Sequence, residues 1–214
     1  MVLPLHDTGR IKTGNALRLD WLEVCPPPKP ASAVEEDLGG PTGRLALDAA
    51  PEPDGETYIC GNPPYSGSAK QSAPQKADME ALFAKVSPVW KSLDYVAGWF
   101  LKAADYSKTA RSSAAFVSTN SICQGEVASI IWPLLYQAEQ SIAFAYTSFK
   151  WANLAAHNAG VTVVIVGLTS ERNFNRKLYA CDDAGSTELR IVKNINPYRV
   201  SGNDICVSAL CARR

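Results

Sequence analysis

The sequence has few of the residues that form metal sites and disulfide scaffolds. It contains only two histidines, His6 and His157, and its six cysteines include no Cys-x-x-Cys pair. These absences argue against the common zinc motifs and against a disulfide-rich fold. We therefore expect no metal, and reduced thiols in a cytoplasmic protein.

Export and membrane signals are also missing. The first ten residues have neither the basic segment nor the long apolar core of a signal peptide. The longest apolar run in the C-terminal half, VTVVIVGL at residues 161–168, is too short to cross a bilayer. We therefore expect no membrane association.

Net charge is absent too, because 21 basic side chains balance 21 acidic ones. The distribution is uneven: residues 1–60 hold five basic and ten acidic side chains, whereas residues 61–214 hold sixteen and eleven. A basic C-terminal part is compatible with a polyanionic partner. Without a clustered patch it does not identify one.

Regular structure is interrupted early and resumes near residue 57. Residues 26–57 are rich in proline, glycine and acidic side chains, which predicts a long connection or insertion. Apolar periodicity then predicts strands at 57–62, 113–121, 141–151 and 161–168, and helices at 78–86, 92–108 and 125–140. Pro133 should kink the last helix or mark its boundary. This order predicts an α/β sheet covered by helices, with the last two strands antiparallel at one edge.

The stretch Asn62-Pro63-Pro64-Tyr65 follows the first strand, where α/β sheets bind ligands. Proline fixes φ and lacks an N–H, so two prolines predict a stiff loop that presents oxygen acceptors. The Asn62 side chain and the Pro63 carbonyl would accept both hydrogens of an exocyclic amine and stabilise charge on its nitrogen. Tyr65 would stack on the ring. An ordinary surface turn is the alternative.

Six sequence blocks occur in a fixed order around this motif. They are GNALRLDW (14–21), YICGNPPYSG (58–67), LDYVAGWFLKAADY (93–106), AAFVSTNSICQGEVASIIWP (114–133), AYTSFKWANLA (145–155) and INPYRVSG (195–202). Together they resemble the adenine-specific DNA methyltransferases of the type IIG/IIL restriction-modification branch. The resemblance implies an incomplete Rossmann-like class I methyltransferase sheet, mostly parallel with an antiparallel edge pair. It also implies S-adenosyl-L-methionine as cofactor and DNA as substrate, with methylation of the N6 amine of a flipped adenine.

The resemblance assigns residues to the target base and to the cofactor. The catalytic residues that it implies are Asn62, Pro63, Pro64 and Tyr65. The cofactor-binding residues that it implies are Asn15, Ala16, Tyr95 and Phe100. Ordinary helix packing explains the two aromatic residues equally well, and a cap or turn would explain Asn15.

A second aromatic residue against the flipped base is implied at Phe149, with Trp151 as its rival. The two residues lie two apart on a predicted strand and so share a face. A stripe of core residues on that strand explains the pattern equally well.

Two features of this family are missing from the sequence. No Gly-x-Gly loop precedes Gly14, so the first cofactor motif and its acidic partner are absent. No target-recognition region follows residue 202. We interpret the chain as four parts, which are a cofactor-side remnant (1–25), the insertion (26–57), the catalytic core (58–170) and the start of a connection to a target-recognition domain (171–214).

These departures leave three hypotheses. The first is a truncated DNA adenine methyltransferase. The second is a non-catalytic remnant or split subunit, which would need a second chain to supply the missing cofactor loop and target-recognition domain. The third is a methyltransferase for protein glutamine or RNA, because Asn-Pro-Pro-Tyr can hold any planar amide or amine. The flanking blocks favour the DNA branch.

Overall fold

The computed structural model describes residues 11–27, 56–151, 161–172, 174–182 and 186–206. Most of the predicted insertion therefore lies outside the described residues. Within them, six strands form one sheet in the order β1-β2-β4-β3-β5-β6. The strands are β1 (Thr57–Gly61), β2 (Ser112–Thr119), β3 (Ser141–Trp151), β4 (Val161–Thr169), β5 (Arg176–Cys181) and β6 (Thr187–Val192).

The strand directions confirm the expected fold class. β1 pairs with β2 and β3 with β5 in parallel, whereas β4 is antiparallel to both β2 and β3, and β6 is antiparallel to β5. Four strands thus run one way and two run the other. The predicted antiparallel pairing of 141–151 with 161–168 is confirmed, but its predicted edge position is wrong. β5 adds beside β3, so β5 and β6 form the antiparallel edge pair and the sheet continues beyond residue 170.

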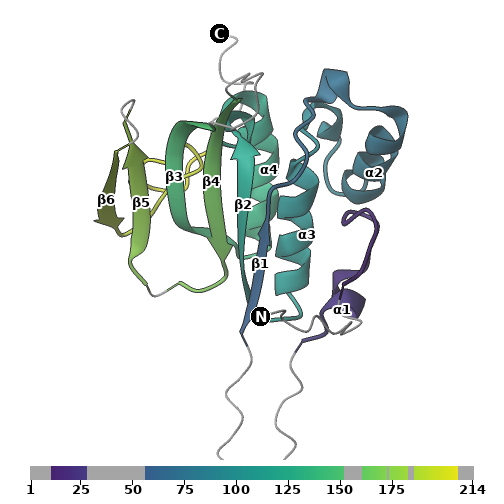
Figure 1. The fold of residues 1–214 in the computed structure, drawn as a ribbon, viewed down its shortest axis with the longest axis horizontal. Helices are drawn as coiled ribbons and strands as arrows, with labels where there is room; N and C mark the ends of the chain where they lie inside the picture. The colour runs from purple at the N-terminus through teal and green to yellow at the C-terminus, as the bar shows by residue number, and fades with distance from the viewer. Residues whose placement is uncertain (1–10, 28–55, 152–160, 173, 183–185, 207–214) are drawn as a thin grey trace, which may run out of the picture.

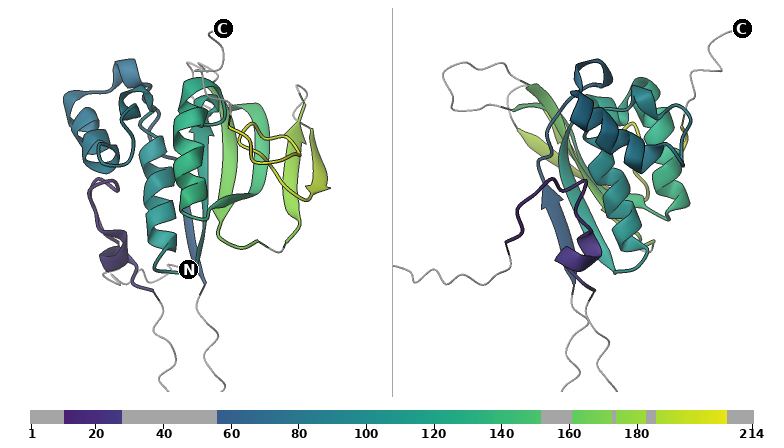
Figure 2. Two further views of the ribbon diagram at one scale, coloured as in Figure 1. Left: turned by 180° about the vertical axis from the view of Figure 1, so that it is seen from behind. Right: turned by 90° about the vertical axis from the view of Figure 1, so that its right-hand side faces the viewer.

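Helices cover one face of this sheet. The α-helices are α1 (Trp21–Val24), α2 (Ala73–Phe83), α3 (Ala97–Ser107) and α4 (Gly125–Gln137), and the short 3-10 helices are η1 (Ser68–Lys70), η2 (Trp90–Ser92) and η3 (Asn120–Cys123). Figure 1 shows α3 and α4 behind the strands, and the side view in Figure 2 shows α2, α3 and α4 on the same side of the sheet. No helix in the described ranges is long and apolar enough to span a membrane.

The core lies between that face and the helices. Burial alternates along β2, and its Phe116, 1% exposed, packs against Phe100 of α3 with ring centroids 5.1 Å apart. Helix α4 contributes Trp132, which is fully buried and donates to the Ile122 carbonyl at 2.7 Å. The helix continues four residues past Pro133 to Gln137, so the proline does not mark its boundary. β1, β2 and β3 point the same way, so their carboxyl ends lie at one edge, where ligands bind in sheets of this kind.

Candidate active site

The Asn-Pro-Pro-Tyr loop leaves the carboxyl end of β1 directly after Gly61. Pro63 is buried, Asn62 and Pro64 are exposed, and Tyr65 is half-buried. The Tyr65 hydroxyl donates a hydrogen bond to Oδ1 of Asn62. The loop thus presents an oriented amide oxygen next to an aromatic ring.

A buried carboxylate anchors this loop to two other elements. Asp94, 6% exposed, accepts from the Ser66 N–H at 3.2 Å, and its other oxygen accepts from the Thr119 hydroxyl at the end of β2 at 3.0 Å. It also accepts from the Val96 N–H at 3.3 Å, just before α3. The Ser66 carbonyl accepts from the Tyr95 N–H at 2.9 Å. Both backbone groups of Ser66 are therefore held, which fixes the end of the loop.

The GNAL segment forms a tight turn below the loop. Gly14 has φ of 152°, a conformation that side chains disfavour, which accounts for glycine at this position. Asn15 follows, and its Oδ1 accepts from the Leu17 N–H at 2.9 Å in an Asx turn. The Arg18 N–H bonds to the Asn15 carbonyl at 2.9 Å and closes the turn.

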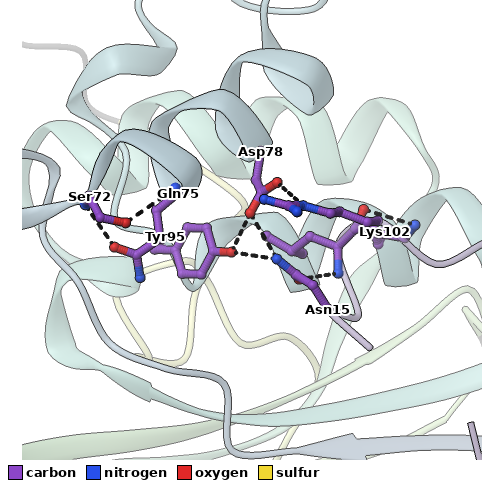
Figure 3. A network of polar contacts seen from close by, with 8 residues as sticks. Asn15, Ser72, Gln75, Asp78, Tyr95 and Lys102 are labelled. Carbon is purple, nitrogen blue, oxygen red and sulfur yellow. Dashed lines mark hydrogen bonds and ion pairs between the residues drawn. The ribbon is translucent and has the colours of Figure 1, made fainter. Parts of the chain in front are cut away.

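Asn15 joins a partly buried polar network (Figure 3). Its Nδ2 donates to Asp78 of α2 at 2.8 Å and lies 3.2 Å from the Tyr95 hydroxyl, which itself donates to Asp78 at 2.8 Å. Arg18 pairs with the other oxygen of Asp78 at 2.7 Å. Burial alone would raise the pKa of Asp78, but the hydrogen bonds and the charge of Arg18 outweigh it and lower that pKa. Asp78 is therefore an ionised acceptor at neutral pH.

One pocket of about 510 Å³ connects the two motifs. Its lining comes from three regions: the GNAL turn, the Asn-Pro-Pro-Tyr loop and the helical layer. The lining residues are Gly14, Asn15, Ala16, Gly61, Asn62, Pro63, Pro64, Gln75, Tyr95 and Trp99. Tyr95 and Trp99 contact each other edge to face, with ring centroids 5.3 Å apart. The pocket thus offers amide oxygens beside an aromatic wall.

Known proteins resemble this chain in sequence and in fold. Residues 1–180 match the model of the family described as MmeI, DNA-methyltransferase domain. The chain belongs to the MmeI DNA-methyltransferase family. This confirms the resemblance that the sequence blocks indicated.

Two relatives of the MmeI family extend the comparison. The chain is 41% identical over 208 residues to DNA methyltransferase A of Bacillus subtilis (strain 168), which covers 97% of this chain and 20% of that protein. The structure of the Type IIL restriction-modification enzyme MmeI in complex with DNA aligns with a TM-score of 0.74 at 35% identity. That alignment covers 92% of this chain and 23% of MmeI. The chain thus spans about a fifth of the length of these relatives.

Most of the cofactor residues that the sequence resemblance implied line the pocket, with one correction. Asn15, Ala16 and Tyr95 are at its surface, whereas Phe100 is fully buried and packs on Phe116. Phe100 therefore belongs to the core, and Trp99 takes the position on the pocket wall. Successive helix residues are about 100° apart around the axis, so neighbours on α3 face different surroundings.

Gln75 also lines the pocket, which its sequence pattern does not predict. It occupies the third position of a capping box at the start of α2, where its side chain accepts from the Ser72 N–H at 2.9 Å. The Ser-x-x-Gln pattern at 72–75 is the signal for that cap. Nothing in the pattern indicates that Gln75 also lines the pocket, because this depends on how α2 packs against a distant segment.

The structure does not bring Phe149 into the same pocket as Asn62. Phe149 lines a separate pocket of about 590 Å³ over β3, β4 and β5, together with Tyr146 and Cys181. In that region the rings of Tyr146 and Tyr179 are stacked, 4.3 Å apart. The side chain of Trp151 lies outside the described part. The role of Phe149 against the target base stays a prediction.

Proposed function

We propose that this chain carries the target-base loop and one wall of the cofactor pocket of a site-specific DNA adenine methyltransferase that uses S-adenosyl-L-methionine. The observation that carries this proposal is the shared pocket, in which residues 14–16 and 62–64 line one cavity. A methyl donor and an amine must meet at such a place. Membership of the MmeI family supports the same reaction.

The size and the lining residues of the pocket fit an adenosyl group. A volume of about 510 Å³ lies within the range of small-molecule sites, roughly 300–1,000 Å³. The amide of Asn15 offers a hydrogen-bond acceptor, and Tyr95 and Trp99 offer aromatic surface for a planar base. When bound, S-adenosyl-L-methionine supplies an electrophilic methyl group on a sulfonium and leaves as S-adenosylhomocysteine, the electron pair staying on sulfur.

The target loop acts on the amine of a flipped adenine. Oδ1 of Asn62 and the carbonyl oxygen of Pro63 accept the two amine hydrogens, which draws the nitrogen lone pair out of conjugation with the ring. These acceptors also stabilise the positive charge that develops on the nitrogen. An amide oxygen is too weak a base to keep the proton, which passes to water. Pro64 stiffens the loop.

Two aromatic residues are proposed to hold the flipped base. Tyr65 is half-buried beside Asn62 and supplies one stacking face. Phe149 near the end of β3 supplies the second face. Stacking of a base on an aromatic side chain contributes roughly 1–3 kcal/mol in single-stranded nucleic-acid systems.

A second candidate is a subunit that methylates only with a partner chain. In this case the partner supplies the glycine-rich cofactor loop and the target-recognition domain. DNA remains the substrate in both cases.

The test is methyl transfer to unmethylated bacterial DNA from labelled S-adenosyl-L-methionine, with the product nucleoside identified by mass spectrometry. We expect N6-methyladenine from the wild type and a loss of at least about a hundredfold in Asn62→Ala, since the loss of one such electrostatic contact costs about 10²–10³ in rate. Cys60→Ser is a matched control, because Cys60 is exposed on β1, the strand that leads into the loop, and lies outside the pocket lining.

The alternatives give different products. If methyl transfer appears only when a second chain with the cofactor loop and the target-recognition domain of a relative is added, this supports the subunit hypothesis. Methylation of RNA or of a glutamine-containing peptide in preference to DNA would contradict the proposal, and so would methylcytosine as the product.

A further inference from the structure

The orientation of the Asn15 amide is determined on both of its ends (Figure 3). A primary amide has two N–H donors and an oxygen with two lone pairs. Nδ2 of Asn15 uses its donors on Asp78 at 2.8 Å and on the Tyr95 hydroxyl at 3.2 Å. Oδ1 accepts from the Leu17 N–H at 2.9 Å. One lone pair of Oδ1 is the hydrogen-bonding capacity that remains.

Asp78 permits only this orientation. It is 7% exposed and its carboxylate accepts but does not donate. If the Asn15 amide were flipped, its oxygen would lie against Oδ2 of Asp78 and its NH2 group would face the Leu17 N–H. One acceptor would then face another acceptor, and one donor would face another donor. In a half-buried site these two clashes cost far more than a lost hydrogen bond in water.

The same carboxylate sets the Tyr95 hydroxyl. That hydroxyl donates its single hydrogen to Asp78 at 2.8 Å, so it can offer a ligand only a lone pair. Asn15 and Tyr95 both line the pocket, and this side of it therefore presents acceptors. Gln75, also in the lining, uses its oxygen on the Ser72 N–H and keeps its amide hydrogens. Among these three side chains, hydrogen-bond donors for a ligand thus come from Gln75, and acceptors come from Asn15 and Tyr95.

We infer that Asp78 determines the specificity of the cofactor site by fixing Asn15 and Tyr95 as acceptors, so that the pocket selects a base carrying an amine over one carrying a carbonyl. This inference rests on the proposed cofactor site. Asp78 itself is not in the pocket lining and acts as a positioning residue. Adenine, with its exocyclic amine, satisfies these acceptors. Hypoxanthine, which has a carbonyl oxygen at the same place, opposes them.

The test compares two ligands on the 214-residue chain. Binding of S-adenosylhomocysteine and of S-inosylhomocysteine is measured by isothermal titration calorimetry. We expect the wild type to bind the adenosyl compound about ten- to a hundredfold more tightly, because the inosyl carbonyl leaves acceptors unpaired. In Asp78→Asn the partner amide can donate as well as accept, Asn15 can turn over, and the preference should shrink to about threefold or less.

Arg18→Met is the matched control for a merely structural effect. Arg18 also bonds to Asp78, but through the oxygen that does not contact Asn15 or Tyr95. This variant weakens the network and should keep the wild-type preference. If Asp78→Asn is unfolded, the wild-type ratio still decides the selectivity.

Each outcome has a separate meaning. Equal binding of the two ligands by the wild type overturns the inferred selectivity. A preference that is unchanged in folded Asp78→Asn overturns the role of Asp78. Binding of neither ligand by the wild type overturns the proposed cofactor site, and the inference with it.

Discussion

Asn62 and Tyr65 are linked by a hydrogen bond within the loop itself. An amide oxygen has two lone pairs, so one remains for the amine of a base. The bond also aims the amide, because the hydroxyl that holds it belongs to a ring fixed by the same loop. Partial burial raises the pKa of Tyr65 above its ordinary value, so the hydroxyl keeps its hydrogen at neutral pH. The proposed ring and amide thus act as a unit.

Two substitutions at Tyr65 separate the ring from the hydroxyl. Tyr65→Ala removes the stacking face, and we expect binding of a single-stranded oligonucleotide containing 2-aminopurine to weaken about ten- to a hundredfold. Tyr65→Phe keeps the face and should bind within about threefold of the wild type. Fluorescence of the 2-aminopurine is the measurement. Equal losses in the two variants would contradict stacking as the main role.

Among the elements, the loop depends on Asp94 for its position. This carboxylate joins Ser66, the start of α3 and the end of β2 by four hydrogen bonds of 3.0–3.3 Å, including one from the Ser121 hydroxyl of η3. A buried group with this many donors around it is costly to remove, because each donor then lacks a partner. The position of a flexible-looking loop is therefore set by a residue nearly thirty positions away.

We expect Asp94→Ala to destabilise the fold by roughly 2–3 kcal/mol and to increase hydrogen exchange in the peptide that covers residues 62–70. Asp94→Asn should restore most of the protection, since its oxygen still accepts from the two N–H groups and its NH2 can donate to the rotated hydroxyls. Hydrogen exchange with mass spectrometry measures both. Glu126→Ala is the control, because the exposed side chain of Glu126 accepts a hydrogen bond from the Ser92 hydroxyl at 3.1 Å and from no other group among the contacts described for it.

The strands up to residue 169 were predictable from the sequence, and the two strands at the far edge of the sheet were not. The predicted strand 141–151 coincides with β3, and α4 lies within 125–140. β5 and β6 were missed although Leu189 and Ile191 alternate with charged residues in β6. Both apolar side chains are exposed, so this alternation marks no core face. Among the site residues, the loop at 62–65 was found from its own chemistry. The choice of Trp99 over Phe100 depends on the rotation of α3 against the GNAL turn, which no local pattern contains.

For the molecule as a whole, docking of residues 11–27 onto the helical layer completes the pocket. Leu17 is 5% exposed and packs at Gly98 of α3, where an added Cβ would lie 2.9 Å from its side chain. Lys102 donates to the Leu19 carbonyl at 2.5 Å, and the Tyr106 hydroxyl donates to the Cys25 carbonyl at 2.8 Å. Asp78 adds an ion pair with Arg18 and accepts a hydrogen bond from Asn15. The pocket is lined by residues of both this segment and the helical layer. It therefore persists only while the segment stays docked.

Acid should therefore weaken the molecule through Asp78. Its pKa in the folded chain is lowered from the ordinary value of 3.8, so its stabilising contribution is fully present above about pH 4 and is lost as the pH falls through the lower folded value. We expect Asp78→Asn to lower the Tm at pH 7 by about 3–8 °C, which corresponds to roughly 1–2 kcal/mol for a chain of this size. Thermal unfolding measured from pH 7 to pH 3 should show the gap between wild type and variant closing below about pH 4.

Asp105→Asn serves as the control in the same series. Asp105 is 54% exposed and pairs only with Lys108 of its own turn among the contacts described, so its ion pair is largely screened by water. Its substitution should change the Tm by less than about 2 °C at any pH. A gap between wild type and Asp78→Asn that stays constant down to pH 3 would mean that the charge of Asp78 does not stabilise the fold. Its hydrogen bonds alone would then hold the GNAL turn against the helices.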